Sequence, residues 1–223
     1  MDVEKLLTQE SARQDAYKGL ANCYNLPQEE LINTLEQLEQ AFETLESEAG
    51  SPIALMRKEI KGSEKLDDLK IEYARLFVGP YSVPAPPYGS VYLEDQRRVM
   101  GHSTMDVQKK YAQAGLTLSE TFKDNPDHIM AELEFMYFLI FKEIQAIQGG
   151  SLETVSDFLL KQRLFLQDHL AVWIKDFGQN IETHSQKNFY KGLAMATQTF
   201  ISEDFAQIAG LEITEPAPAV SQG

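Results

Sequence analysis

Cysteine is almost absent from this sequence, with Cys23 the only one among 223 residues. An intramolecular disulfide is therefore impossible, and a Cys-rich metal cluster is excluded as well. This usage fits a reducing compartment, and the cytoplasm is the compartment that we expect. Cys23 has no positive neighbour in sequence to activate its thiol, so the sequence favours a small buried side chain over a nucleophile.

Long apolar runs and positive charge are also scarce. No stretch of 18 consecutive apolar residues occurs, and the N-terminal sequence MDVEKLLTQESARQDAYKGL lacks the basic start and apolar run of a signal peptide. We expect neither export nor a membrane span. The 34 acidic residues outnumber the 20 basic ones and give a net charge of -14. Because nucleic acid and anionic lipid are negative too, the composition disfavours both and favours a basic partner.

The common catalytic motifs are missing. Neither GxSxG, GxxxxGK[ST] nor a GxGxxG after a strand is present, so hydrolase, P-loop and dinucleotide-binding functions have no local support. His128 and Glu132 lie one helical turn apart and could serve as metal ligands or as a base. A metal site needs three or four protein ligands, however, and the other histidines show no matching spacing. A metal-dependent helical enzyme is a minor alternative, and we expect a non-enzyme without a cofactor.

Helical periodicity is what the sequence does contain. Strand-like alternation bounded by turns is absent, as are Asn-Gly and Asp-Gly hairpin signals. We predict an all-α, single helical-bundle-like domain of about seven to ten helices over residues 1–210, with a disordered tail at 211–223. The helical stretches are 27–49, 64–77, 103–115, 126–148, 151–177 and 184–209.

Capping residues suggest where these helices begin and end. Ser103 and Asn125 are the expected N-caps, with Pro126 at the first helical position and Asp127 in the first turn. Expected stops are Gly50, Gly115, Gly149, Gly178 and Gly210. Residues 27–49 carry seven glutamates and no Lys or Arg, which we interpret as a solvated acidic face over an apolar stripe.

The segment LFVGPYSVPAPPYGSVYLED, residues 76–95, places four of the nine prolines within eight residues. Closely spaced prolines fix an extended path that costs little further entropy to hold in place. Tyr81, Tyr88 and Tyr92 supply rigid amphipathic faces suited to peptide contact. The residues leave two interpretations equally open: a preformed peptide-binding surface, or a rigid crossover packed on the helices that serves only the fold. In either case we predict a long Pro-rich loop at 78–102.

Four stretches together resemble the TorD/DmsD family of redox-enzyme maturation chaperones, and more distantly the NarJ type. They are EYARLFVGPYSVPAPPYGSVYLE, Gly101 with the helix start STMDV, PDHIMAELEFM, and FLQDHLAVWIKDF with FYKGLA. The similarity covers most of the chain from Tyr73 to Phe205. It implies an all-helical, non-catalytic cytoplasmic protein that binds the twin-arginine leader peptide of a molybdenum-containing oxidoreductase subunit. Such a protein holds the subunit back from export until its molybdopterin cofactor is inserted.

The resemblance also implies a peptide-binding site. Its expected residues are Tyr73, Leu76, Phe77, Tyr81, Pro86, Pro87, Tyr88, Ser90 and Tyr92 of the first motif, and Pro126, Asp127 and His128 of the second. Asp127 is expected to pair with a leader arginine, His128 to hydrogen-bond peptide backbone or position the loop, and the aromatic residues to contact the apolar run. The acidic residue common before the second motif is replaced by Asn125, for which Asp124 could substitute.

Several points stay open at this level. A carrier of molybdopterin or of a guanine nucleotide for the same client is the main alternative function. The chain could be a monomer or a dimer formed by helix exchange. Nothing in one sequence selects the molybdoenzyme that is its client.

Overall fold

The computed structural model describes residues 2–60, 63–80, 82–94, 99–117 and 124–213, and it confirms the all-α prediction. No strand occurs among these residues, and residues 214–223 of the predicted tail lie outside them. The α-helices are α1 (Val3–Cys23), α2 (Leu31–Thr44), α3 (Ile53–Glu59), α4 (Ser63–Tyr73), α5 (Ser90–Leu93), α6 (His102–Gln113), α7 (Ile129–Gln148), α8 (Leu152–Phe165), α9 (Ala171–His184) and α10 (Asn188–Ala209). A 3-10 turn, η1 (Glu48–Gly50), follows α2, and two π-helical turns, η2 (Ala74–Val78) and η4 (Leu166–Leu170), extend α4 and join α8 to α9.

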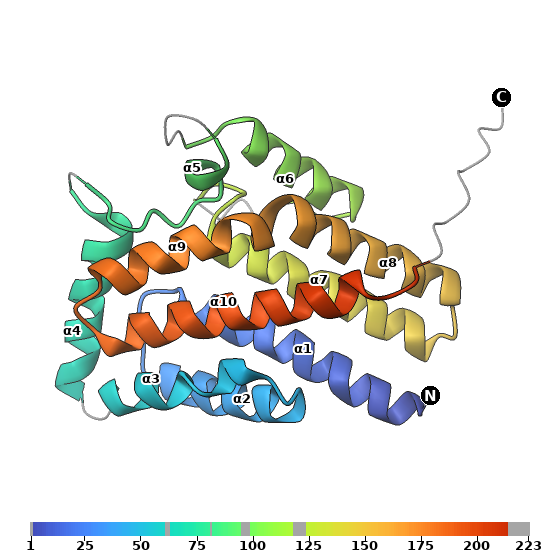
Figure 1. Cartoon of the computed structure of the whole chain (residues 1–223), viewed down its shortest axis with the longest axis horizontal. Coiled ribbons are helices and arrows are strands. Elements are labelled where there is room, and N and C mark those ends of the chain that lie inside the picture. The colour runs from blue at the N-terminus through green and yellow to red at the C-terminus, as the bar shows by residue number, and fades with distance from the viewer. Residues whose placement is uncertain (1, 61–62, 81, 95–98, 118–123, 214–223) are drawn as a thin grey trace.

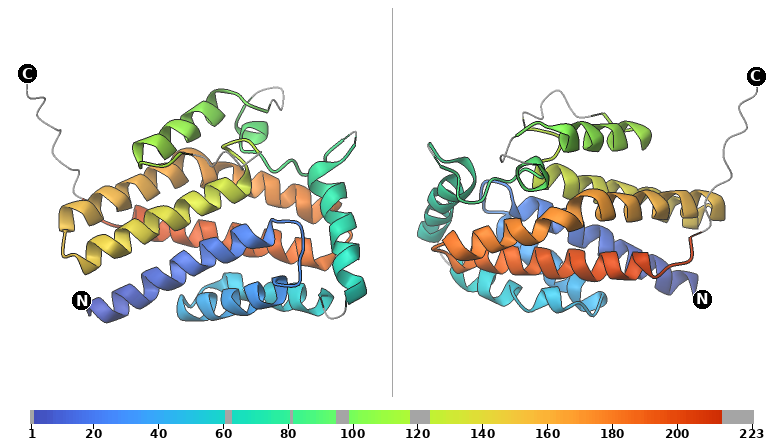
Figure 2. Two further views of the ribbon diagram at one scale, coloured as in Figure 1. Left: turned by 180° about the vertical axis from the view of Figure 1, so that it is seen from behind. Right: turned by 45° about the horizontal axis from the view of Figure 1, so that its top comes forward.

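The long helices lie roughly alongside one another (Figures 1 and 2). Helix α1 packs on α7 and α2, α7 packs on α8, and α10 packs on α9 and α3. Helix α4 stands across one end of the bundle, while α5 and α6 sit on top of α9 and α8 in the view of Figure 1. Within the described part of the chain, no helix is both long and apolar enough to span a bilayer.

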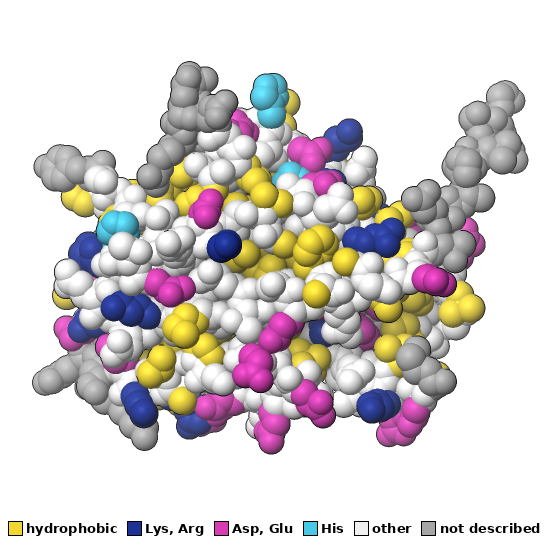
Figure 3. All heavy atoms as spheres, viewed as in Figure 1, with side chains coloured by type: hydrophobic (Ala, Val, Ile, Leu, Met, Phe, Trp, Pro, Cys, Tyr) yellow, Lys and Arg dark blue, Asp and Glu magenta, His cyan; other side chains and the backbone are white. Residues whose placement is uncertain are grey.

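Helix α2 shows how the apolar stripe and the acidic face divide. Leu31, Leu35, Leu38 and Phe42 are buried in the core, as their helical spacing predicts. The glutamates of the same segment point outward, and acidic side chains gather along the lower edge of the molecule in Figure 3, where α2 and α3 lie. The sequence thus correctly predicts which face of this helix is solvated.

Two predicted helix boundaries are wrong. The helix predicted at 27–49 runs only from Leu31 to Thr44. Glu46, with a positive φ of 53°, ends it before the expected stop at Gly50. The helix expected to stop at Gly178 continues through it to His184. A Cβ atom at Gly178 would lie 2.2 Å from the Gln198 side chain of α10, so this glycine allows close helix packing rather than a stop. The stops at Gly149 and Gly210 are confirmed, since both are C-caps.

The two predicted N-caps are also wrong. Gly101 precedes α6, and Ser103 instead donates from its backbone N–H and its Oγ to Glu94 Oε1, at 2.7 and 2.5 Å. The N-cap of α7 is His128, so Pro126 and Asp127 form a turn before the helix rather than its first turn. At α7 the predicted cap fails because residues 125–128 form a separate turn, in which the backbone N–H of His128 donates to the Asn125 carbonyl.

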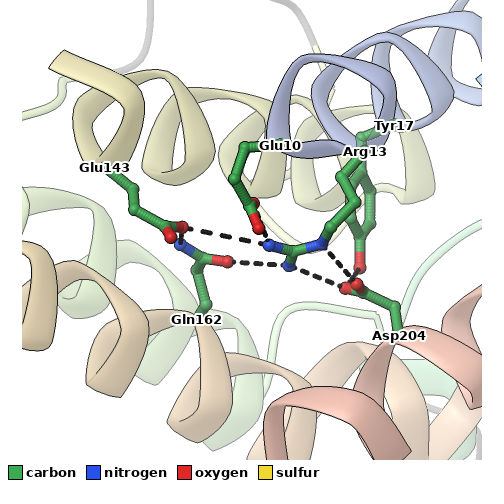
Figure 4. A network of polar contacts seen from close by, with 6 residues as sticks. All are labelled: Glu10, Arg13, Tyr17, Glu143, Gln162 and Asp204. Atoms are coloured by element: carbon green, nitrogen blue, oxygen red, sulfur yellow. Dashed lines mark hydrogen bonds and ion pairs between the residues drawn. The ribbon is translucent and has the colours of Figure 1, made fainter. Parts of the chain in front are cut away.

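Helix α1 contributes to a buried polar network that was not predicted from the sequence (Figure 4). The Arg13 guanidinium donates to Asp204 Oδ1 at 2.7 Å and to Gln162 Oε1 at 3.0 Å, and it also contacts Glu10. Glu143 Oε2 lies 3.9 Å from Arg13 and accepts from Gln162 Nε2 at 2.6 Å. One cation thus ties α1 to α7, α8 and α10. It also interrupts the apolar face of α1, which explains why that helix is not among the predicted stretches.

We expect this network to make stability fall as pH rises. Burial, followed by the charge of Glu10, raises the pKa of Glu143 to about 7. The folded state therefore holds a proton that the unfolded state releases between its ordinary pKa of about 4.5 and about 7. For this one group, the free energy of unfolding should decrease across that window with a slope approaching about 1.4 kcal/mol per pH unit. Urea unfolding at several pH values measures this slope.

The control for that experiment is Glu143→Gln. The amide removes the titration while keeping a side chain of similar size beside Gln162. The difference in stability between the variant and the parent should change steadily from pH 5 to about pH 7 and level off above it. A difference that is constant with pH would rule out Glu143 as the titrating group.

A candidate peptide-binding pocket

The two motifs that stand out in the sequence are joined by backbone hydrogen bonds. We call residues 79–89 the proline strap and residues 126–128 the PDH segment. Tyr88 and His128 form an antiparallel β-bridge. On either side of it, the Ile129 N–H donates to the Pro87 carbonyl at 2.9 Å and the Gly89 N–H donates to the Asp127 carbonyl at 2.8 Å. The strap is therefore fixed to the start of α7.

Asp127 holds this junction from inside the protein. Its side chain is 1% exposed, and Oδ2 accepts a hydrogen bond from the Ser90 N–H at 2.8 Å. Ser90 begins α5, so the carboxylate lies where backbone N–H groups at a helix start are unpaired. This position differs from the expected one, in which Asp127 meets a leader arginine directly.

His128 links the junction to the surface of the pocket. Its Nδ1 accepts from the Met130 N–H at 3.2 Å and caps α7, while its ring lies edge-on to Tyr88 with the centroids 5.2 Å apart. Burial lowers the pKa of His128, and the nearby Asp124 and Asp127 carboxylates oppose that shift. Both the lowered pKa and the hydrogen bond from the Met130 N–H are consistent with a neutral His128 ring.

A pocket of about 710 Å³ opens beside this junction. Its walls come from the strap, the end of α4 with η2, the residues before α7, and α9. It is lined by Tyr73, Phe77, Val78, Ser82, Val83, Pro84, Pro86, Pro87, Tyr88, Val91, Val99, Asp124, His128, Asn180 and His184. The lining is thus mixed, with apolar and aromatic side chains beside polar and ionisable ones, which suits a ligand that is partly apolar and partly charged.

Asp124 is the one carboxylate among the described lining residues. Its side chain is exposed, and Oδ1 accepts from the Tyr88 hydroxyl at 3.0 Å. Burial first, and this hydrogen bond second, raise the pKa of Tyr88, so the phenol keeps its proton at neutral pH. Asp124 therefore presents a negative charge to the pocket while Tyr88 holds it in place.

Behind the pocket, α9 anchors the strap and α5. Trp173 stacks on Tyr92 with the ring centroids 5.6 Å apart, and its Nε1 donates to Glu132 Oε2 at 3.0 Å. Burial is the main cause that raises the pKa of Glu132 well above its usual range, although the Trp173 bond opposes it. A Cβ atom at Gly89 would lie 3.0 Å from Trp173 Nε1 and 3.1 Å from Glu132 Oε1. Only a glycine lets the strap approach this closely.

The site residues expected from the sequence divide into two groups. Tyr73, Phe77, Pro86, Pro87, Tyr88 and His128 line the pocket. The others do not: Leu76, Ser90 and Asp127 are buried beneath it, Tyr92 packs on Trp173, and the Pro126 carbonyl accepts from the Tyr111 hydroxyl. Tyr81 lies outside the described residues.

Sequence reasoning missed the wall formed by α9. Asn180 and His184 line the pocket although they are far along the chain from the strap. The stretch FLQDHLAVWIKDF pointed to this helix, but periodicity alone did not tell which of its flanks faces the strap. Among the described residues, no group of three or more His, Cys, Asp or Glu side chains is placed to hold a metal ion. His128 and Glu132, the pair that could have served a metal, bond to Met130 and Trp173 instead.

Comparison with known proteins gives consistent results. Residues 28–179 match the family described as nitrate reductase delta subunit. The chaperone protein TorD of Vibrio parahaemolyticus is 25% identical over 157 residues, which are 70% of this chain and 71% of that protein. TorD of Photobacterium profundum is 28% identical over 169 residues, which are 74% of this chain and 77% of that protein. The Tat proofreading chaperone DmsD of Salmonella paratyphi A is 27% identical over 169 residues, which are 76% of this chain and 74% of that protein.

A crystal structure described as that of a candidate redox enzyme maturation protein, from Archaeoglobus fulgidus, has the same fold. It covers 85% of this chain and 93% of its own, with a TM-score of 0.53 and 23% sequence identity. The likeness to it concerns the fold alone, whereas the family match extends over more than half of the chain. This protein therefore belongs to the nitrate reductase delta subunit family, in agreement with the resemblance of its strap and PDH segment to the TorD and DmsD chaperones.

Proposed function

We propose that this protein is a chaperone that binds the twin-arginine leader peptide of a molybdenum-containing oxidoreductase subunit. By holding the leader, it keeps the subunit in the cytoplasm until the cofactor is inserted and folding is complete. The observation that carries the proposal is the pocket where the strap meets the PDH segment. The names of the relatives, a Tat proofreading chaperone among them, support it.

The chemistry of the pocket suits such a leader. A twin-arginine leader joins a basic stretch to a moderately apolar run, so its receptor needs a carboxylate beside an apolar surface. Asp124 supplies the charge, and Tyr73, Phe77 and Tyr88 supply aromatic surface. Each well-buried apolar side chain contributes about 1.5–3 kcal/mol before the cost of ordering the peptide. A leader seated here would be withheld from the export machinery.

The strap forms one wall of the pocket in the absence of a peptide, so the site is preformed. Its prolines fix the backbone, and the bridge to His128 holds it against α7. Little conformational entropy remains to be lost when a peptide binds, and this preorganisation favours affinity. The same segment therefore serves both interpretations that the sequence left open, as a crossover fixed in the fold and as one wall of a binding site.

A synthetic leader should bind with micromolar or better affinity, and Asp124→Asn should weaken that binding about tenfold, which corresponds to about 1.4 kcal/mol for a charge-assisted contact. The physical reason is the loss of the charge that faces the pocket. Calorimetric titration at two salt concentrations measures it, and salt should weaken binding less in the variant than in the parent. The stability of the variant should be unchanged because Asp124 is exposed.

Asp127→Ala is the matched comparison. It leaves the buried Ser90 N–H without its acceptor, so we expect a loss of stability of about 1–3 kcal/mol together with any loss of binding. If Asp124→Asn binds the leader like the parent while Asp127→Ala weakens binding without destabilising the protein, the roles assigned to the two residues are reversed. Binding of a guanine nucleotide in place of the leader would favour the carrier function instead.

A further inference from the structure

The pocket presents one described carboxylate, Asp124, whereas a twin-arginine leader carries two guanidinium groups. A second negative group is expected within reach of the same peptide, and it must be free of other partners to be available. The following inference rests on the proposed function and concerns where the second arginine binds.

Asp176 lies on the flank of α9 that faces α5. The residue three positions before it, Trp173, stacks on Tyr92, and the residue four positions after it, Asn180, donates from Nδ2 to the Tyr92 hydroxyl at 3.4 Å. Residues three and four apart share one side of a helix. Asp176 therefore lies between two residues that both contact α5, one turn from Asn180, which lines the pocket.

The other flank of α9 belongs to α10. Gly178 approaches Gln198, and Gln198 Nε2 donates to Glu182 Oε1 at 2.7 Å. Asp176 lies on the side of α9 away from this contact and is exposed.

Asp176 also differs from acidic residues of α6, α8 and η4 in having no partner among the described residues. Asp168 pairs with Lys110 at 3.0 Å, Asp106 with His169 at 2.8 Å, and Asp157 with Lys161. No ion pair or hydrogen bond of the Asp176 side chain occurs within the described part of the chain. An exposed carboxylate without a cation is an available site for a guanidinium group, which can bind it through two parallel hydrogen bonds.

We propose that Asp176 is a specificity-determining residue of the pocket and binds one of the two leader arginines while Asp124 binds the other. The two carboxylates come from separate walls, the residues before α7 and helix α9, so the peptide lies between them. A leader with both arginines then contacts both walls, and a leader with a single arginine contacts only one.

A double-mutant cycle tests this assignment. Asp176→Asn and Asp124→Asn are each titrated calorimetrically with a synthetic two-arginine leader and with the two leaders in which one arginine is glutamine. We expect Asp176→Asn to weaken binding of the two-arginine leader about tenfold. The same substitution should change binding by less than about twofold when the arginine that it contacts is already glutamine, because coupled residues are not additive. Asp124→Asn should couple to the other arginine.

Asp168→Asn is the control, since that carboxylate is exposed on the neighbouring π-helical turn and pairs with Lys110 outside the pocket. It should leave binding of all three leaders unchanged. If Asp176→Asn and the charge reversal Asp176→Lys both bind the two-arginine leader like the parent, the inference is wrong while the proposed function stands. If the parent binds the two-arginine leader no better than one lacking both arginines, the proposed function itself fails and the inference with it.

Discussion

Replacing Arg13 by methionine is expected to lower the free energy of unfolding by about 3–5 kcal/mol, the range for removing one partner of a buried charge cluster. Arg13 is 3% exposed and lies among Glu10, Glu143 and Asp204. Without it, three buried carboxyl groups face one another with no cation between them. Methionine fills much of the space of the arginine stem, so the loss measures charge rather than volume.

Urea denaturation followed by circular dichroism measures this effect. Lys18→Met is the matched control, because Lys18 is on the same helix and pairs with Glu134 at the surface. An exposed pair of this kind contributes at most about 1 kcal/mol. A loss below about 1 kcal/mol for Arg13→Met would mean that the carboxyl groups take up protons at little cost when the arginine is removed.

Trp173→Ala should have an effect of similar size, about 3–5 kcal/mol, because it removes a large side chain from the core and leaves a cavity. Trp173 is 1% exposed and contacts both Tyr92 and Phe177. Tyr92 would lose the ring on which it stacks, and α5 would keep only its contacts with Phe177 and Asn180 among those described for Tyr92 on α9. Leader binding should weaken as well, since the strap ends at α5.

Trp173→Phe separates packing from hydrogen bonding. A phenyl ring keeps the aromatic contact but removes the Nε1–H that donates to Glu132 at 3.0 Å. We expect a smaller loss of about 1–3 kcal/mol, the cost of leaving a buried polar group without its partner. Thermal unfolding of both variants in parallel checks that Trp173→Ala is the more destabilising substitution. If Trp173→Phe were as destabilising as Trp173→Ala, the hydrogen bond rather than the packing would be the main contribution.

The burial of Asp127 is a feature of this site that the sequence did not predict. The resemblance singled out Asp127 as the residue that meets an arginine, yet the structure buries it under Ser90 and exposes Asp124 three residues earlier. A carboxylate looks the same in sequence whether it caps a backbone turn or faces solvent. The turn from Asn125 to His128 determines the difference, and the strap pairs with this turn through Tyr88.

The sequence by itself determined the helical class, the apolar stripe of α2, the two glycine C-caps and the unusual strap, because each of these depends on residues close together in the chain. Tertiary structure alone decided that the strap is joined to the PDH segment, that α9 supplies a wall with Asn180 and His184, and that an arginine in α1 is surrounded by carboxyl groups from α7 and α10. Such contacts join residues far apart in sequence. Local periodicity gives the side of a helix that is buried but not the partner that covers it, so only the packed chain could bring these groups together.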